Sequence, residues 1–344
     1  MAETTNRPHV VFGAGGGVGS ALVRELLSRG KRVRAVSRSG RGSFPKGAEV
    51  VRVDATDAAG AREVCRGAVA IYHAVNVPYP QWQGTLPLVM SATIEAASSA
   101  GARLVYADNL YMYGKAKGSM TEETPYEPVS RKGILRARLA DELMSAHRNG
   151  KVRAAIGRAS DVYGPGPLNA VAGERLFGAA LAGKKAMWVG DLDAPHTLTY
   201  VGDFAKALVT LGEREEALGE AWHTPSAEPT TGREFIELVF DEARRPPRFG
   251  TYTRTMMLLG GVFSSEVREF REMLYQFEVP FVLDSSKYVR TFSDLASTPY
   301  REGIARTVRW HLSGRRDDEQ VAREGASGGH DDSAEGDSGS LRSW

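Results

Sequence analysis

The sequence predicts an α/β fold, in which a doubly wound parallel sheet carries helices on both faces and a smaller C-terminal part follows. Short strand-like segments alternate with helical segments over about the first 160 residues, an order typical of parallel sheets. A glycine cluster lies between the first expected strand and the first expected helix. After Tyr163 the alternation is lost, which indicates a change of architecture.

The expected strands are short and apolar, and they span residues 10–12, 33–36, 50–53, 69–72, 104–107 and 152–156. In the first helical segment Val18, Leu22 and Leu26 recur every four residues, and Gly30 follows as the residue that ends the helix. Further helices are expected at 86–100 and 137–147. In a sheet built this way, ligands bind at the carboxyl ends of the strands.

The composition excludes several classes of protein. Of the 344 residues 42% are hydrophobic and 25% charged, and the net charge of +2 gives no field that would attract nucleic acid. The longest apolar run, residues 256–263, is far shorter than the ~20 residues that span a bilayer. We expect this run to form a buried helix or a lid over a pocket, and we expect no membrane partner. The single cysteine, Cys65, excludes an intramolecular disulfide, and residues 1–8 lack the apolar core of a signal peptide, so a cytoplasmic location is expected.

The glycine loop between the first strand and helix predicts a dinucleotide-binding Rossmann fold. Glycines allow a tight turn and a close approach of the backbone to a pyrophosphate, and the helix N-terminus offers free N–H groups to it. The spacing Gly-x-x-Gly-x-x-Gly fits in full at Gly13, Gly16 and Gly19, and a merely flexible turn is the alternative. Contacts to the cofactor are expected from Gly13, Gly15, Gly16, Gly17, Val18 and Gly19.

The end of the second strand bears on the choice between NAD(H) and NADP(H). An acidic residue at this point binds the ribose 2′-hydroxyl of NAD, whereas an arginine suits a 2′-phosphate. Here Arg38 follows the strand, with Arg41 nearby, so NADP(H) is favoured over NAD(H). A solvated surface arginine is the alternative. Asp54, after the third strand, is predicted either to accept a hydrogen bond from the adenine amine or to cap the next helix.

These features divide the chain into three parts. Residues 8–165 are expected to form the dinucleotide-binding Rossmann domain, and residues 166–315 a mixed substrate-binding part, with 198–212 returning to the Rossmann layer. From Arg316 onward Gly, Ser, Asp and Glu dominate, so residues 316–344 are expected to be a disordered tail. We predict no metal site, and interpret His330, Asp331 and Asp332 as solvated residues of this tail.

Together with the glycine loop, several motifs resemble the extended short-chain dehydrogenase/reductase family, also called the NAD-dependent epimerase/dehydratase family. The resemblance spans roughly residues 8–312 and includes segments 71–74, 121–128, 157–166, 199–205 and 298–310. It implies further cofactor contacts at Ala55, Ala74 and Ser160. It also implies a small-molecule substrate held between the two parts, and a homodimer.

The family's acid–base residues are a Tyr-x-x-x-Lys pair on one helical face and an upstream Ser or Thr. When the chain is aligned on Pro128 and Gly133, Lys132 takes the tyrosine position and Arg136 the lysine position. Asn109 takes the position of the Ser or Thr. Two other pairs spell Tyr-x-x-x-Lys, but both fall in an expected loop, where that spacing guarantees no shared face: Tyr111 with Lys115, and Tyr113 with Lys117.

Several residues are candidates to replace the missing tyrosine. Lys132 is one proton donor, if burial or Arg136 lowers its pKa; alternatively Arg136 holds the ribose and Lys132 is solvated. Tyr111 could supply a phenol, Asn109 could polarise a carbonyl, and Asp108 is either a base or a residue that holds the loop together. Substrate contacts are expected from Tyr113 and His196, with packing of its loop as the alternative for His196. Four aromatic residues either line the pocket or form its core: Tyr275, Phe277, Phe281 and Tyr288.

The leading hypothesis is an NAD(P)-dependent oxidoreductase or epimerase that acts on a small carbonyl compound or alcohol with a non-standard active site. The cofactor carries the hydride, and the protein positions it. The loss of the Tyr and Lys motivates two alternatives on the same fold. One is a non-redox isomerase, lyase or cyclase, and the other is a dinucleotide-sensing protein without catalytic activity.

Overall fold

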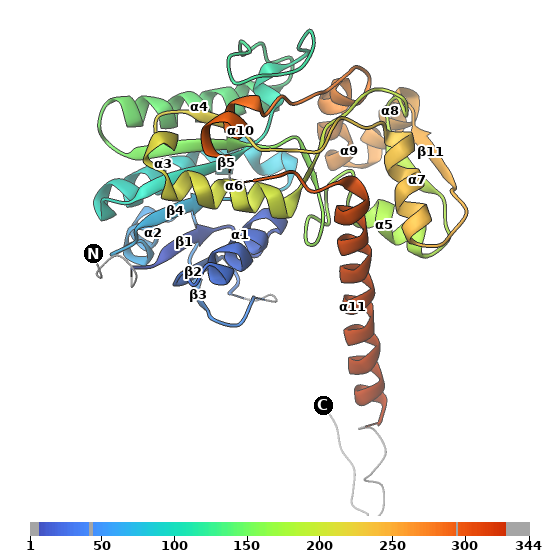
Figure 1. Cartoon of the computed structure of the whole chain (residues 1–344), viewed down its shortest axis with the longest axis horizontal. Helices are drawn as coiled ribbons and strands as arrows, with labels where there is room; N and C mark the ends of the chain where they lie inside the picture. Colours follow the sequence, from blue (N-terminus) through green and yellow to red (C-terminus); the bar gives the residue numbers. More distant parts are fainter. Residues whose placement is uncertain (1–6, 41–43, 294, 328–344) are drawn as a thin grey trace, which may run out of the picture.

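The central element of the computed structural model is a seven-stranded sheet (Figure 1), and the structure describes residues 7–40, 44–293 and 295–327. The strand order is β10-β6-β5-β4-β1-β2-β3, and every neighbouring pair is parallel. The strands are β1 (His9–Phe12), β2 (Val33–Ser37), β3 (Ala48–Arg52), β4 (Ala70–His73), β5 (Arg103–Asp108), β6 (Arg153–Arg158) and β10 (Ala221–His223). The predicted doubly wound parallel sheet is therefore confirmed.

Helices cover both faces of this sheet. On one face α2 (Ala58–Val64), α3 (Trp82–Ala100) and α4 (Arg131–Arg148) pack against Val10, Phe12 and Ile71. On the other face α1 (Gly17–Ser28) and α6 (Val201–Glu213) pack against Val11 and Tyr72. The alternation of side chains along each strand sends successive apolar residues to opposite faces, so each strand contributes to two cores. Most of the segment 198–212 belongs to α6 and packs on this face of the sheet, whereas residues 198–200 belong to a separate small sheet.

The C-terminal part lies beside the carboxyl ends of the strands and has its own apolar core (Figure 1). Its strands form two parallel pairs, β7 (Asp161–Tyr163) with β9 (Leu198–Tyr200), and β8 (Ala186–Val189) with β11 (Phe249–Tyr252). Its helices are α5 (Glu174–Leu181), α7 (Gly232–Glu242), α8 (Arg254–Phe263), α9 (Ser265–Phe270) and α11 (Tyr300–Ser327). Helix α10 (Ser286–Phe292) instead packs on the seven-stranded sheet, where Phe292 contacts Trp222 of β10. Short 3-10 helices complete the chain: η2 (Tyr79–Gln81), η3 (Tyr111–Tyr113), η4 (Glu215–Ala217) and η5 (Arg271–Phe277).

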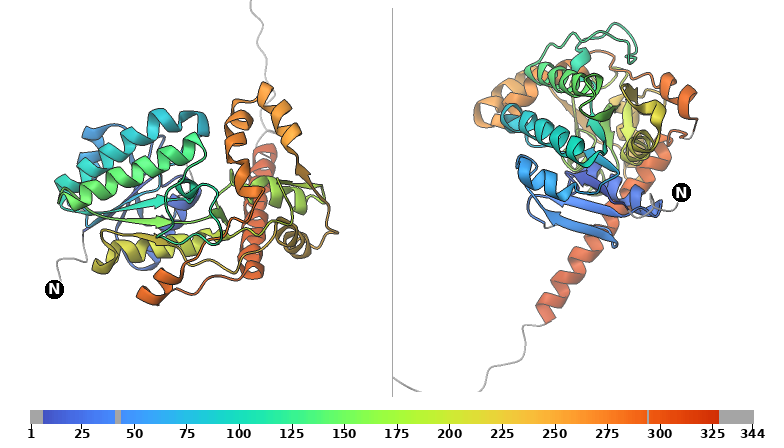
Figure 2. Two further views of the ribbon diagram at one scale, coloured as in Figure 1. Left: turned by 90° about the horizontal axis from the view of Figure 1, so that it is seen from above. Right: turned by 90° about the vertical axis from the view of Figure 1, so that its left-hand side faces the viewer.

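Two segments differ from what the sequence predicts. Residues 256–263 form most of α8, but the expectation of a buried helix is wrong, because Phe263 is 92% exposed and Val262 71%. The expected tail begins at Arg316, whereas α11 continues to Ser327 and projects from the rest of the molecule (Figure 2). Residues 328–344, which include His330, Asp331 and Asp332, lie outside the described residues.

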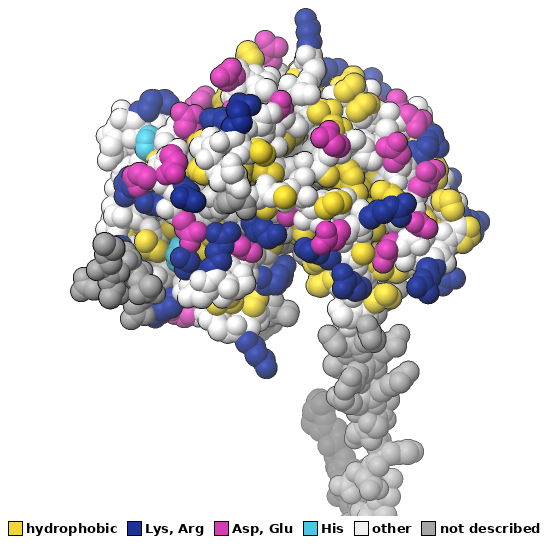
Figure 3. Space-filling model, in the orientation of Figure 1, with side chains coloured by type: hydrophobic (Ala, Val, Ile, Leu, Met, Phe, Trp, Pro, Cys, Tyr) yellow, Lys and Arg dark blue, Asp and Glu magenta, His cyan; other side chains and the backbone are white. Residues whose placement is uncertain are grey.

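The net charge of the chain is +2. Basic and acidic side chains are interspersed over the face shown in Figure 3. No helix in the described part of the chain is both long enough and apolar enough to cross a membrane.

Candidate active site

The glycine loop, residues 13–19, passes from β1 into α1 through contacts that exclude side chains. Gly13 has a φ of +80°, and a Cβ atom at this position would lie 2.5 Å from the carbonyl oxygen of Ala74. A Cβ at Gly17 would lie 2.6 Å from the backbone nitrogen of Pro167, and one at Gly19 would collide with the carbonyl oxygen of Gly13. Only glycine fits these close approaches, so the loop is more than a flexible turn.

The start of α1 offers backbone groups to an anion. Gly16 is the N-cap residue, and no side chain caps the first turn, which begins with Gly17 and the half-buried Val18. Gly15 and Gly16 are exposed, and a Cβ at Gly15 would meet only the Ser37 hydroxyl, at 3.9 Å. The N–H groups of the first turn therefore have no capping side chain and lie beside the exposed Gly15 and Gly16, while the backbone of residues 166–167 lies against Gly17.

The ends of β2 and β3 lie next to this loop. Arg38 is exposed, and its carbonyl oxygen accepts a hydrogen bond from Arg52. The Asp54 carboxylate accepts hydrogen bonds from both the backbone N–H and the hydroxyl of Thr56, at 2.9 and 2.8 Å. The alternative that Asp54 caps the next helix is wrong, because Asp57 caps α2. Ala55 is buried behind Asp54, and Arg41 lies outside the described residues.

At the carboxyl ends of β4 and β6, buried polar atoms lack partners within the described structure. They are both ring nitrogens of His73 and the Ser160 hydroxyl, and Nε of Arg136 in α4 also lacks a partner. Buried polar groups are nearly always hydrogen-bonded, so unpaired ones here fit a site that a polar ligand completes. Ala74, whose carbonyl faces Gly13, connects these groups to the glycine loop. The residues present therefore fit a dinucleotide whose pyrophosphate lies on the loop and whose other end reaches β6.

Lys132, in the first turn of α4, is buried and held by two carboxylates. Its Nζ donates to Glu269 at 2.7 Å and to Glu272 at 2.5 Å, and lies 4.9 Å from the centre of the Tyr79 ring. The side chain is 3% exposed, so the alternative of a solvated Lys132 is wrong. Arg131 contacts the same two glutamates from the surface, where it is 67% exposed. The lysine thus joins α4 to α9 and η5, and its charge is already neutralised.

Arg136, in α4, and Asp108, at the end of β5, form a second buried ion pair. The Arg136 guanidinium donates to the Tyr106 hydroxyl at 2.5 Å and to the Asp108 carboxylate at 3.3 Å, and it lies 4.3 Å from the centre of the Trp82 ring. The other oxygen of Asp108 accepts from Arg158 at 3.4 Å. With two guanidinium groups bound to it, Asp108 serves to hold these side chains together rather than to act as a free base.

Tyr113 lies inside a buried network instead of on an open surface. Arg158 donates to the Tyr113 hydroxyl at 2.6 Å and to that of Tyr126. The Tyr113 hydroxyl also lies 2.8 Å from Nε2 of His223, whose Nδ1 donates to the carbonyl oxygen of Asp284. Burial, followed by Arg158, lowers the pKa of His223 to about 3, so the ring is neutral and Nε2 accepts from Tyr113. Tyr113 is 1% exposed, and its hydroxyl is bound by Arg158 and His223, so it stabilises this network without facing solvent.

A pair of phenols lies where the strands β4 and β5 end. The hydroxyls of Tyr79, in η2, and Tyr111, in η3, are 3.0 Å apart, and the Tyr111 ring stacks on Trp82. Asn109 accepts a hydrogen bond from the backbone N–H of Tyr111 and so shapes this turn. Burial raises the pKa of Tyr79 to about 12 and that of Tyr111 well above its ordinary range, so both phenols are protonated at neutral pH. Such a pair donates hydrogen bonds or a proton but does not act as a base.

An aspartate and a histidine form a second pair next to these phenols. Nε2 of His196 donates to the Asp161 carboxylate at 2.8 Å. The His196 ring is stacked between Phe277 and Phe281, with ring centres 5.0 and 5.4 Å away. Asp161 lies shortly after the carboxyl end of β6 and is 16% exposed, whereas His196 is 3% exposed. The carboxylate is therefore positioned by a fixed imidazole and reachable from solvent.

The two motifs that spell Tyr-x-x-x-Lys are not acid–base pairs on one helical face. Gly114, with a φ of +65°, ends η3 and redirects the chain between each tyrosine and its lysine. Lys115 and Lys117 are exposed, while the side chain of Tyr113 is enclosed. The Tyr-x-x-x-Lys spacing in this loop therefore does not place a lysine beside either tyrosine on a helical face.

Sequence reasoning missed Tyr79, Asp161, Glu269 and Glu272. Asp161 had a usable signal, because it follows the expected strand 152–156 at the edge where ligands bind in such sheets. The two glutamates are more than 130 residues from Lys132 in the chain, and no local pattern connects them to it.

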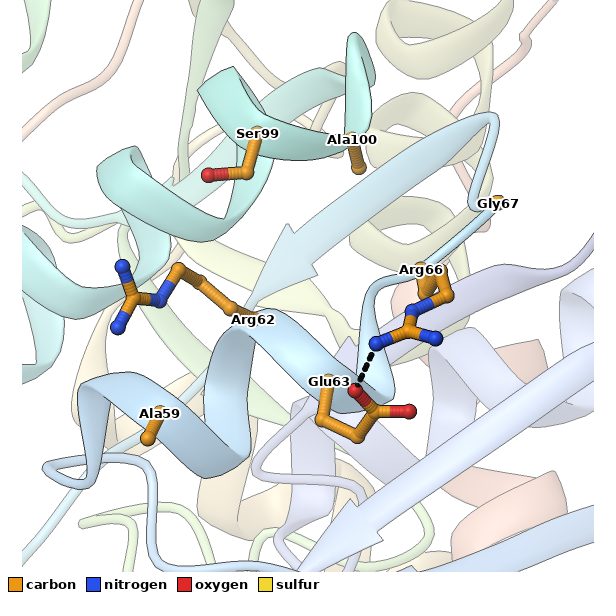
Figure 4. A pocket seen from close by; sticks show the side chains of 7 residues that line it. All are labelled: Ala59, Arg62, Glu63, Arg66, Gly67, Ser99 and Ala100. Atoms are coloured by element: carbon orange, nitrogen blue, oxygen red, sulfur yellow. Dashed lines mark hydrogen bonds and ion pairs between the residues drawn. The ribbon is translucent and has the colours of Figure 1, made fainter.

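A hollow of about 420 Å³ between α2 and α3 lies elsewhere (Figure 4). Its lining residues are Ala59, Arg62, Glu63, Arg66, Gly67, Ser99 and Ala100. Glu63 forms an ion pair with Arg66. It lies where β4 and β5 begin, opposite the carboxyl ends that carry the glycine loop and the phenols. It is therefore separate from the candidate active site. No group of three or more His, Cys, Asp or Glu within the described ranges could hold a metal ion.

Solved structures share this fold over nearly the whole chain. MoeE5 in complex with UDP-glucose and NAD is 22% identical, with a TM-score of 0.72 over 90% of this chain and 99% of that one. The dTDP-glucose 4,6-dehydratase DesIV from Streptomyces venezuelae, with NAD and TYD bound, is 22% identical, with a TM-score of 0.71 over 90% and 98%. The UDP-glucose 4-epimerase of Thermus thermophilus, in complex with NAD, is 21% identical, with a TM-score of 0.72 over 88% and 98%.

Sequence comparison identifies the family directly. No curated protein sequence matches the chain. The model of the NAD dependent epimerase/dehydratase family matches residues 9–223, which is more than half of the 344 residues and includes the glycine loop, the phenol pair and Asp161. The resemblance seen in the motifs is thus confirmed, and the chain belongs to the NAD dependent epimerase/dehydratase family.

Proposed function

We propose that this protein is a nicotinamide-dinucleotide-dependent oxidoreductase or epimerase that acts on a small carbonyl compound or alcohol without the family's Tyr-x-x-x-Lys pair. The observation that carries the proposal is the uncapped first turn of α1 behind the glycine loop, at the same sheet edge as the phenol pair. Proteins with this fold, MoeE5 and DesIV among them, are described as binding NAD.

The bound dinucleotide would accept or deliver a hydride at the substrate carbon. The chain's own residues would handle the proton. Tyr111 and Tyr79, both protonated, would donate to a carbonyl oxygen, which favours reduction over oxidation at neutral pH. Lys132 would not donate this proton, because Glu269 and Glu272 bind its ammonium group.

The structure also supports a non-redox alternative on one specific observation. Asp161, positioned by His196, is a carboxylate next to two protonated phenols. A base and an acid held at one site can move a proton from carbon to oxygen, as isomerisation or elimination requires. Transfer of deuterium from labelled cofactor to the product separates the two reactions, because the non-redox reaction incorporates none.

We propose NADP(H) as the preferred cofactor, on the strength of Arg38. Its exposed guanidinium at the end of β2 is free to form a forked contact with a 2′-phosphate. The test is a titration of the protein with NADPH and with NADH, followed by cofactor fluorescence, for the wild type and for Arg38→Ala.

We expect NADPH to bind about tenfold tighter than NADH and Arg38→Ala to erase that difference, since a charged hydrogen bond contributes about 1.5–3 kcal/mol. Arg66→Ala, at the opposite end of the sheet, is the matched control and should change neither affinity. Equal affinities in the wild type would refute the NADP(H) preference, and binding of neither cofactor would refute the proposed function.

A further inference from the structure

A groove beside α1 and α6 contains none of the residues of the glycine loop or the phenol pair. The two helices pack side by side on one face of the sheet (Figure 1), and the groove has a volume of about 260 Å³. Its lining includes Ala21, Gly202 and Ala205, whose short side chains leave room for a ligand. Pro165 and a residue of α11 complete the wall, so the groove joins the Rossmann layer to the C-terminal part.

Three cationic side chains from three different helices line this groove. They are Arg24 of α1, Lys206 of α6 and Arg306 of α11, and we call them the cation triad. Arg24 and Arg306 are exposed, and the side chain of Lys206 is 41% exposed, so a dissolved ligand can reach all three. Like charges that face one groove repel one another unless an anion neutralises them.

Nearby carboxylates neutralise two members of the triad only in part. The Lys206 ammonium lies 3.8 Å from Asp203, whose oxygens already accept hydrogen bonds from the backbone and the hydroxyl of Thr298 at 2.6 and 2.9 Å. Arg306 pairs with Glu302, and both side chains of this pair are exposed to solvent. Exposed pairs of this kind contribute little, so both cations keep donors for a ligand.

Arg24 has no such partner. No hydrogen bond or ion pair binds its guanidinium within the described part of the chain, and partial burial lowers its pKa. Glu25, the neighbouring residue of the lining, is bound by Arg29 at 2.7 Å. The five N–H donors of Arg24 therefore remain available.

Tyr200 adds a buried hydroxyl close to the two arginines. It is 7% exposed, and the Arg306 guanidinium lies 5.8 Å from the centre of its ring. Burial raises the pKa of Tyr200, whereas the charges of Arg306 and Arg24 act in the opposite direction, which places the hydroxyl near both guanidinium groups. The hydroxyl keeps its proton at neutral pH and can donate it in a hydrogen bond to an anion.

We propose that this groove binds a small phosphate compound, either inorganic phosphate or a phosphate monoester. Arg24 would form a forked pair of charged hydrogen bonds with the phosphate oxygens. Lys206 and Arg306 would add their charges, and the Tyr200 hydroxyl would donate a further hydrogen bond. The site goes beyond the proposed function, because it shares no lining residue with the glycine loop or the phenol pair.

The test is a calorimetric titration of the full-length protein with inorganic phosphate and, separately, with glycerol 3-phosphate at low ionic strength. We expect at least one of them to bind with a dissociation constant below about 2 mM, and binding should weaken about tenfold in about 0.5 M sodium chloride, because salt screens exposed charges. The tighter compound identifies free phosphate or a monoester as the ligand. Dissociation constants above about 2 mM for both would overturn the inference.

A repeat with NADPH present separates this groove from the glycine loop, which also offers donors to a phosphate. The affinity for the phosphate compound should stay the same, because the cation triad lies outside that loop. Displacement by NADPH would place the phosphate on the loop and overturn the inference. If NADPH does not bind, the proposed function fails, whereas variants of the triad still test the groove.

Two variants locate the bound phosphate. Arg24→Gln should weaken binding about tenfold and Lys206→Gln about threefold, since the first removes unshared charged donors and the second a partly neutralised charge. Both positions reach the surface, so neither substitution should disturb folding. Arg62→Gln is the matched control, because this exposed arginine of α2 lines the separate hollow in Figure 4. Equal weakening by Arg24→Gln and Arg62→Gln, or no weakening by either groove variant, would overturn the inference.

Discussion

The glycine loop and the first turn of α4 face the same sheet edge, yet only the first keeps its family pattern. The loop depends on backbone contacts, such as the one between Gly19 and the carbonyl oxygen of Gly13, that no side chain tolerates. The turn depends on side chains, and α4 contains no tyrosine but carries the cations Lys132 and Arg136. Both are buried and each has an acidic partner. The backbone site thus excludes an added Cβ, whereas the buried side-chain site requires an acidic partner for each cation.

The largest expected effect breaks the backbone side of this comparison. In Gly19→Ala the new Cβ collides with Gly13 and lies 2.8 Å from Cα of Ala14, so the loop must shift. We expect the unfolding free energy to fall by about 3 kcal/mol, the upper range for overpacking, and NADPH binding to be lost. Gly15→Ala is the matched control, since its Cβ would meet only the Ser37 hydroxyl, at 3.9 Å. Urea unfolding of both variants checks this, and equal destabilisation would show that the contacts of Gly19 are not special.

The second prediction addresses the side-chain region. In Lys132→Met, Glu269 and Glu272 lose the ammonium group that binds them both, and we expect a loss of about 2–3 kcal/mol in unfolding free energy. Arg131→Met is the control, because it contacts the same carboxylates from the surface and should cost less than about 1 kcal/mol. If Lys132→Met instead keeps full stability and abolishes turnover, Lys132 is a catalytic residue and not a structural one.

The third prediction concerns His73, which lies between the two regions at the end of β4. Burial, followed by Arg136, lowers its pKa from 6.5 to about 3. Below about pH 6.5 the unfolded chain therefore binds a proton that the folded protein does not, and stability is lost as the pH falls, by about 1.4 kcal/mol per pH unit. Between about pH 7.5 and pH 5 this amounts to about 2 kcal/mol.

His73→Phe tests this assignment, because phenylalanine keeps the edge-on contact with Tyr106 and carries no titrating group. Chemical unfolding at both pH values should show the variant losing about 2 kcal/mol less than the wild type. His9 and His223, whose pKa values are also lowered, act in the same direction in both proteins and cancel in the difference. Identical pH dependence of variant and wild type would mean that His73 is protonated in the folded protein.

The same contrast explains how much could be predicted from the sequence. The strand segments and the glycine loop could be predicted from the sequence, because alternation, apolar runs and Gly spacing are local patterns. That Lys132 and Arg136 replace the family's catalytic pair stays a prediction from spacing. The burial and ion pairs of Lys132 could not be predicted, because its partners lie in α9 and η5, far away in the sequence. The exposure of α8 was missed for a related reason, since an apolar run does not show which face a neighbour covers.

The smallest expected effect sharpens the comparison at the phenol pair, which the family's motif does not include. The hydroxyls of Tyr79 and Tyr111 are 3.0 Å apart, so one donates to the other in the unliganded protein. In a double-mutant cycle of Tyr79→Phe and Tyr111→Phe, we expect a coupling energy of about 1 kcal/mol in the unfolding free energy. The coupling should persist up to about pH 10, since both pKa values are raised and neither phenol ionises below that pH. Additive single effects would show that the two hydroxyls act independently, and a coupling that disappears near neutral pH would show that one of them ionises there and acts as a base.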